Sequence, residues 1–80
     1  MKDTLKLVYL EWVDSSGSTD GWYHLKDFEP NLVRCKSVGW VVYETDEYIT
    51  VLPHMGDESQ GRGELTIPVC AIKKRKVIRL

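Results

Sequence analysis

Residues 5–13 read Leu-Lys-Leu-Val-Tyr-Leu-Glu-Trp-Val, and this stretch decides the class of fold. Its β-branched, aromatic and aliphatic side chains are typical of a β-strand. The alternation of a strand divides its apolar side chains between two faces, with Leu5, Leu7, Tyr9 and Val13 on one and Val8, Leu10 and Trp12 on the other. A strand that is apolar on both faces is usually covered on both, or covered on one and bound to a partner on the other.

The residues that follow this strand predict a long connection. Residues 14–21 are all Asp, Ser, Gly or Thr, a composition that favours a loop. Beyond them Trp22, Leu25 and Phe28 recur at a three-residue spacing, which fits one or two turns of helix capped by Asp20. We expect the aromatic side chains here to pack the loop against the body of the fold.

The middle of the chain predicts a hairpin. Residues 32–43 form a long strand in which Gly39 indicates a bend or a bulge. Residues 44–47, Glu-Thr-Asp-Glu, form an acidic turn, and residues 48–55 form the returning strand. Residues 56–63 contain three glycines and predict a second, flexible loop.

The C-terminal quarter predicts two more strands. Residues 64–67 form a short strand that Pro68 ends, and residues 69–72 fit a single tight turn. Residues 73–80 form the last strand, with three apolar side chains available for burial: Val77, Ile78 and Leu80.

This order of elements predicts an all-β fold, a small five-stranded SH3-like barrel over residues 1–80 with a long first loop and a single tight turn before the last strand. A barrel suits a short chain because curling the sheet protects most of its edges. An open five-stranded antiparallel sheet and an OB-like barrel are the alternatives. An all-helical fold is excluded, since no stretch longer than about eight residues keeps an apolar period of 3.6.

The composition of the chain indicates what kind of protein it is and where in the cell to expect it. The chain of 80 residues is 42% hydrophobic and 29% charged, as folded globular proteins are. Its net charge of −1 gives no global attraction to DNA or to a membrane, so any nucleic-acid surface has to be local. The first residues lack the apolar run of a signal peptide, and no segment has the roughly 20 apolar residues that span a bilayer. We expect a soluble cytoplasmic protein in which Cys35 and Cys70 are buried, reduced thiols.

Three pieces of the sequence carry a resemblance. They are Cys35-Lys-Ser-Val-Gly-Trp-Val-Val, Leu52-Pro-His and Thr66-Ile-Pro-Val-Cys-Ala-Ile. Together they resemble small uncharacterised accessory proteins of tailed bacteriophages and prophages, over most of residues 5–72. The resemblance implies a bacterial host cytoplasm and an accessory role during infection. The resemblance assigns no functional residue, because the shared pieces are features that shape the fold and not chemical motifs. They are a bend at Gly, a buried Trp and a strand that ends at Pro.

The strongest charge feature is the basic run Lys73-Lys74-Arg75-Lys76, extended by Arg79. Such cations could contact phosphate groups. On a strand, however, Lys74 and Lys76 face away from Lys73, Arg75 and Arg79, and the acidic turn at 44–47 could neutralise part of the run. Lysines on an exposed edge strand also oppose aggregation, and we favour that simpler explanation.

Aromatic residues are the second feature. Three Trp, four Tyr and one Phe exceed what the thin core of so short a chain easily encloses. We therefore expect Trp22 and Tyr23 to reach the surface and line a binding groove. Arg62, between two glycines, could reach an anionic partner. No spacing joins His24 or His54 to a cysteine as a zinc site would, and we expect no cofactor, no metal and no catalysis.

The leading functional hypothesis is a non-catalytic binding module, a phage accessory protein that engages a host protein and works as a homo-oligomer. One alternative is nucleic-acid binding through the basic C-terminal strand. Another is sequestration of a small anionic nucleotide between subunits, through Arg62, His54 or an aromatic side chain. An enzyme is the least favoured class, because so small a fold can hardly enclose a pocket with several convergent polar groups.

Overall fold

The computed structural model describes residues 5–17 and 21–80. Its main element is a five-stranded antiparallel sheet with the strand order β6-β3-β2-β1-β7. The strands of this sheet are β1 (Leu7–Asp14), β2 (Val33–Glu44), β3 (Tyr48–Leu52), β6 (Leu65–Pro68) and β7 (Ile72–Ile78). A separate two-stranded hairpin joins β4 (His54–Gly56) to β5 (Gln60–Arg62). The short 3₁₀ turns are η1 (Leu25–Asp27), η2 (Asp57–Ser59) and η3 (Val69–Ala71).

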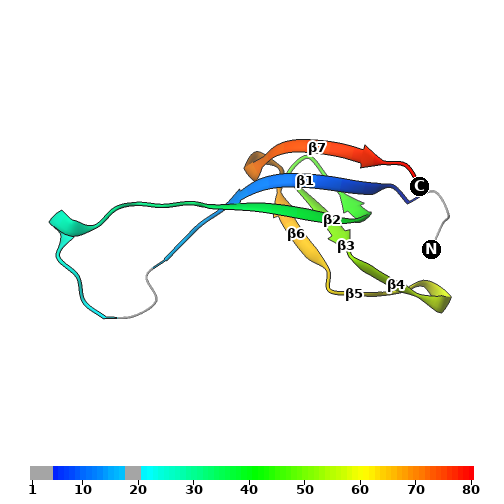
Figure 1. Cartoon of the computed structure of the whole chain (residues 1–80). Helices are drawn as coiled ribbons and strands as arrows, with labels where there is room; N and C mark the ends of the chain where they lie inside the picture. The colour runs from blue at the N-terminus through cyan, green and yellow to red at the C-terminus, as the bar shows by residue number, and fades with distance from the viewer. Residues whose placement is uncertain (1–4, 18–20) are drawn as a thin grey trace.

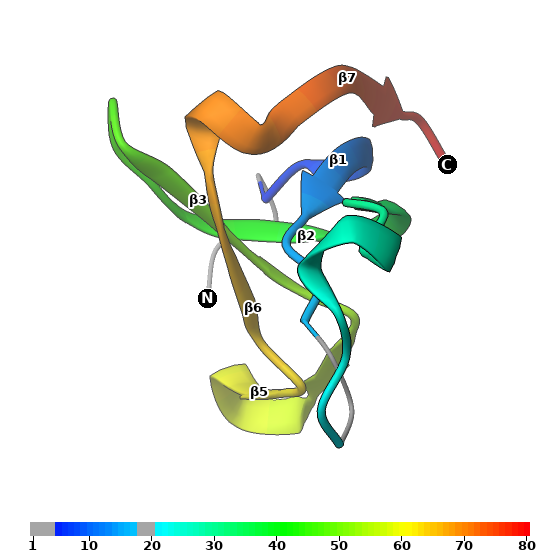
Figure 2. The ribbon, with the colours of Figure 1, turned by 90° about the vertical axis from the view of Figure 1, so that its left-hand side faces the viewer.

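The sheet curls so that strands from its two halves enclose one small core. Figure 2 shows β7 and β1 passing across the direction of β6. The core consists of the buried side chains Val8, Leu10, Ile49, Val51 and Ile67, from β1, β3 and β6. Each of these side chains contributes about 1.5–3 kcal/mol through its removal from water. Trp12 and Val41 pack at the margin of this core.

The hydrogen-bonded ladder remains open in the described part of the chain. β6 and β7 lie at opposite edges of the sheet order and are joined only through η3. An all-β fold with five antiparallel strands is therefore confirmed, and a closed barrel is not observed. The tight turn before the last strand is also confirmed as η3, and the Val69 N–H there donates to the carbonyl oxygen of Glu47 at 2.9 Å.

The connection between β1 and β2 extends far from the sheet (Figure 1). We call its described residues, 15–17 and 21–32, the arm. The molecule measures 53 × 23 × 23 Å with a radius of gyration of 16.3 Å, whereas a compact chain of this length would have about 12 Å. The expectation that aromatic residues pack this loop against the body is wrong, because every residue of the arm is exposed.

The helix expected in the arm is reduced to one short turn. η1 spans Leu25–Asp27 only and buries none of its residues. Its cap position is His24, which makes no side-chain capping hydrogen bond. The proposed cap, Asp20, lies outside the described residues. A single turn has too few side chains on one side to form an amphipathic face that could pack against the sheet.

Gly39 allows close approach between strands and does not mark the bulge. The register between β2 and β3 shifts between Val41 and Tyr43, two residues beyond the predicted site. A Cβ on Gly39 would lie 2.9 Å from the Leu52 carbonyl oxygen and 3.0 Å from the Cβ of Val51. Glycine is required here because any larger residue would displace β3.

Three further expectations need correction. The returning strand β3 ends at Leu52, since Pro53 interrupts the ladder before β4. The glycine-rich stretch predicted as a flexible loop forms the paired hairpin of β4 and β5. Leu80 is fully exposed, because β7 ends before it at Ile78. No helix in residues 5–17 or 21–80 is long and apolar enough to cross a membrane.

Candidate functional site

The structure separates the residues of the basic run. In β7, Arg75 lies opposite the buried Leu10, whereas Lys74 and Lys76 lie opposite Glu11 and Tyr9. Directly opposed residues share a face of the sheet, so Arg75 points to the core side while Lys74 and Lys76 point outward. Lys73 occupies a register shift between β1 and β7. The prediction that successive side chains of the basic run face opposite sides of the sheet is therefore confirmed for Lys74, Arg75 and Lys76.

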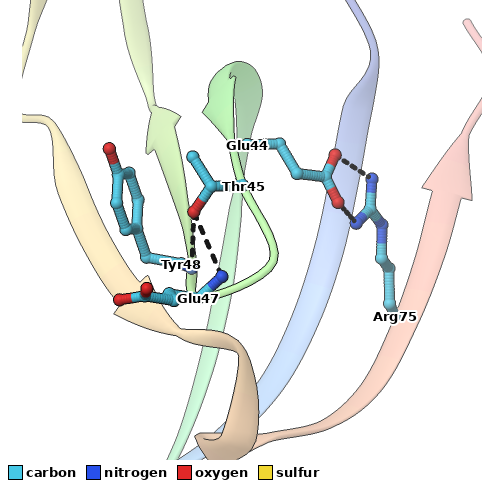
Figure 3. A network of polar contacts seen from close by, with 5 residues as sticks. All are labelled: Glu44, Thr45, Glu47, Tyr48 and Arg75. Carbon is cyan, nitrogen blue, oxygen red and sulfur yellow. Dashed lines mark hydrogen bonds and ion pairs between the residues drawn. The ribbon is translucent and has the colours of Figure 1, made fainter.

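Arg75 is paired with a carboxylate on the other half of the sheet. Its two terminal nitrogens donate to the Glu44 carboxylate at 2.5 and 3.2 Å (Figure 3). The hydrogen bond from Arg75 holds the pKa of Glu44 below its ordinary value, and the pKa of Arg75 is raised for the same reason. The acidic turn thus neutralises one member of the basic run, as the sequence suggested, and Arg75 is not available to a ligand without loss of this pair.

The turn that carries Glu44 is fixed by a threonine. The hydroxyl oxygen of Thr45 accepts hydrogen bonds from the N–H groups of Glu47 and Tyr48 at 3.1 and 3.2 Å (Figure 3). The Thr45 N–H itself donates to the Tyr48 carbonyl oxygen at 2.9 Å. Side-chain oxygens of this kind stabilise tight turns, so the end of β2 presents Glu44 in a defined direction.

Two cations that the sequence analysis missed join the outward lysines. In β2, Lys36 lies opposite Glu11 and Arg34 lies opposite Val13. Their side chains therefore share the outward face with Lys74 and Lys76 of β7. All four are exposed, and we call them the cationic face: Arg34, Lys36, Lys74 and Lys76. The alternation of Arg34 and Lys36 with Cys35 and Ser37 was the sequence signal that could have revealed them.

The centre of the cationic face holds one carboxylate and one phenol. Tyr9 and Glu11 lie on β1, between the two cation-bearing strands. The Tyr9 hydroxyl donates to Glu11 Oε2 at 2.5 Å. This hydrogen bond raises the pKa of Tyr9 above its ordinary value, because ionisation would remove the proton that the carboxylate accepts, and the negative charge of Glu11 adds to the effect. With four cations and one carboxylate, the face is net positive in a chain that is net negative.

The arm carries the other concentration of exposed chemistry. Five large apolar side chains are exposed on it, namely Trp22, Tyr23, Leu25, Phe28 and Leu32. Trp22 is fully exposed and Leu25 is 83% exposed. Tyr23 and Phe28 stack on each other with ring centroids 5.4 Å apart and planes 21° apart. Trp22 and Tyr23 therefore reach the surface, as expected, on an extended arm and not beside the sheet.

The remaining candidate residues lie elsewhere. Arg62 pairs with His54 across the hairpin of β4 and β5, in a different sheet from the cationic face. The structure therefore brings together His54 and Arg62, two of the residues considered for binding a nucleotide. Neither β4 nor β5 contains a Trp, Tyr or Phe side chain that could join them. The described part of the arm, the segment that includes Trp22 and Tyr23, extends away from β7 and its basic run (Figure 1).

The expectation of two buried thiols is wrong. Cys70 is exposed in η3, and Cys35 is only partly covered. Cys35 lies opposite Trp12, towards the end of β1 that leads into the arm. Both thiols are free. No group of three or more His, Cys, Asp or Glu side chains in the described residues is arranged to hold a metal ion.

Two of the hollows on the described surface lie at the two ends of β1. One, of about 160 Å³, is bordered by Trp12, Arg34, Lys36 and Lys73. The other, of about 400 Å³, lies at the opposite end of β1 and is an open depression that includes Trp40 and Ile78. The first is smaller than the roughly 300–1,000 Å³ of typical small-molecule sites, so it could receive a side chain or a phosphate but not a whole nucleotide.

Comparison with known proteins assigns no family to this arrangement. No family model, no curated protein and no solved structure matches the chain.

Proposed function

We propose that this protein is a non-catalytic binding module whose arm engages another protein molecule. The observation that carries the proposal is the set of five exposed apolar side chains on a segment that leaves the sheet. Contiguous exposed apolar surface commonly marks interaction sites. A buried aromatic side chain removes about 150–250 Å² from water, which at about 25 cal/mol per Å² corresponds to roughly 4–6 kcal/mol before ordering costs.

The fold proposed for this module is an SH3-like barrel. Its support is the strand order, in which four strands follow as a meander and the last strand returns to pair with the first. The 3₁₀ turn η3 directly before the last strand belongs to the same plan. In this scheme the arm is the long first loop, the segment through which barrels of this type commonly bind ligands.

The proposed setting is a phage or prophage accessory protein that binds a host protein in the bacterial cytoplasm. Its support is the resemblance in the framework segments. A second copy of the chain is the other partner considered, because 80 residues bury little apolar surface and self-association would cover the arm.

A photo-crosslinking amino acid at position 22 tests the proposal. The control carries the same group at Tyr43, which is 69% exposed on the sheet and not on the arm. The expected result is a crosslinked adduct from position 22 in bacterial lysate, lost when Leu25 is replaced by Ser. The purified protein is irradiated in parallel, and a crosslinked dimer there identifies the partner as a second copy. Equal crosslinking from both positions, or none from position 22 in either sample, would refute the proposal.

A further inference from the structure

We propose that the cationic face binds the phosphate backbone of single-stranded nucleic acid. This surface lies on the sheet and uses none of the exposed apolar side chains of the arm, although Arg34 borders the base of the arm, so the inference does not depend on the proposed protein partner. Its four cations come from β2 and β7, which are distant in sequence and are brought together by pairing with β1 on both sides.

The spacing of the cations suits a flexible polyanion. Lys36 and Lys74 both lie opposite Glu11, so these two cations are about 10 Å apart across the sheet, whereas Arg34 and Lys76 lie one row away from them in opposite directions along β1. Within each strand the two cations are two residues apart, or about 7 Å. Cations at these intervals can contact several phosphates of one strand, whereas a single phosphate could reach only one or two of them.

The outward side of the sheet also carries planar groups on which bases could stack. Tyr9 lies between Lys76 and Val38 in the register, and Val38 is 48% exposed. One row further along β1, Trp40 lies opposite Leu7 and borders the open depression at that end of the sheet. Proteins that bind single strands without sequence preference combine a positive surface with aromatic side chains on which bases stack. The cationic face has both components.

The charges elsewhere in the chain favour this face over others. Acidic residues concentrate on the turn after β2 and around η2, and Arg75 is already paired with Glu44. A polyanion is therefore repelled by these regions and attracted to the outward side of β1, β2 and β7. Glu11 is the one carboxylate on the described part of this face, and it opposes binding.

Fluorescence anisotropy with labelled single-stranded DNA and RNA oligonucleotides tests the inference. With four phosphate contacts the slope of log K against log salt is about −0.7 × 4, or roughly −2.8. Between 50 and 200 mM salt the affinity should therefore fall about 50-fold. The double variant K36E/K74E should lose at least tenfold in affinity at 50 mM salt and at least halve the slope.

Two further variants separate a local site from net charge. K26E/R62E changes the net charge by −4, as K36E/K74E does, but the changes lie on the arm and on β5. Its affinity for the oligonucleotides should therefore stay within about twofold of wild type. Glu11→Gln should bind more tightly than wild type, because it removes the opposing charge. Thermal melts of each variant confirm that it is folded.

Several outcomes would overturn the inference. One is the absence of oligonucleotide binding by wild type at 50 mM salt, including the case in which the protein binds anionic lipid vesicles instead. A second is an equal loss of affinity in K26E/R62E and K36E/K74E. A third is weaker binding by Glu11→Gln. Unchanged binding by Trp22→Ser would show that the cationic face acts without the arm, whereas loss of binding in that variant would place the site elsewhere.

Discussion

Replacing Gly39 by Ala should destabilise the protein through a clash at one defined point. The added Cβ would lie 2.9 Å from the Leu52 carbonyl oxygen and 3.0 Å from the Val51 Cβ. Neither atom is the end of a flexible side chain, so β2 and β3 have to move apart. Overpacking of this kind costs about 1–3 kcal/mol. In a domain of this size that corresponds to a fall in Tm of roughly 5–20 °C.

The control for this variant is Gly17→Ala. Nothing lies within 4 Å of a Cβ placed there, and the φ angle of Gly17 is not in the left-handed region. Alanine at that position should leave stability unchanged or raise it slightly, since it restricts the unfolded chain. Urea denaturation followed by circular dichroism measures both variants. A Gly39→Ala protein as stable as wild type, or one destabilised no more than Gly17→Ala, would refute the close-approach argument.

Three further predictions test the core, the ion pair and the phenol. Leu10→Ala should lower the free energy of unfolding by about 2–5 kcal/mol, because Leu10 is fully buried, and a smaller loss in urea denaturation would contradict the core assignment. Glu44→Gln should cost at most about 1 kcal/mol at pH 7, since its pair with Arg75 is partly exposed and screened by solvent. Because the folded pKa of Glu44 is lowered, the stabilisation is present above the unfolded pKa near 4.5 and is lost as the pH falls through the folded value, so wild type and Glu44→Gln should converge in strong acid. In ultraviolet titrations compared with Tyr9→Phe, Tyr9 should ionise above pH 10.0, and Glu11→Gln should lower that pKa. An unchanged titration in Glu11→Gln would contradict the hydrogen bond.

Much of the fold could be predicted from local signals in the sequence. Runs rich in β-branched, aromatic and aliphatic residues located β1 and β2, and the turn before the last strand was recognised beside Pro68. The limits of β3 were less predictable, because Pro53 ends the ladder while the chain continues in an extended form as β4. Pairing of the glycine-rich segment with β4 depends on contacts between segments, which local composition does not encode.

The position of the aromatic residues in the arm was the main error about the fold. Burial was expected because aromatic side chains usually pack in cores. The core has little room for them, however, because the buried volume is filled by short aliphatic side chains such as Val8, Ile49 and Ile67. Tyr23 and Phe28 cover part of each other instead. Composition indicated that there were too many rings for the interior, and Trp22 and Tyr23 were expected to reach the surface, as they do, but nothing in the composition indicated that the whole segment would extend away from the sheet.

The cationic face could not be found from sequence because it depends on register. The basic run suggested one surface of consecutive residues, yet only Lys74 and Lys76 face outward, and their partners come from β2. A shift of β7 by one residue would exchange its two faces and place Arg75 outward. The pair between Arg75 and Glu44 opposes such a shift, since it joins β7 to the end of β2 on the core side. The pair between Arg75 and Glu44 thus helps to keep Lys74 and Lys76 on the outward face. A variant that breaks this pair should bind nucleic acid more weakly only if β7 also changes its register.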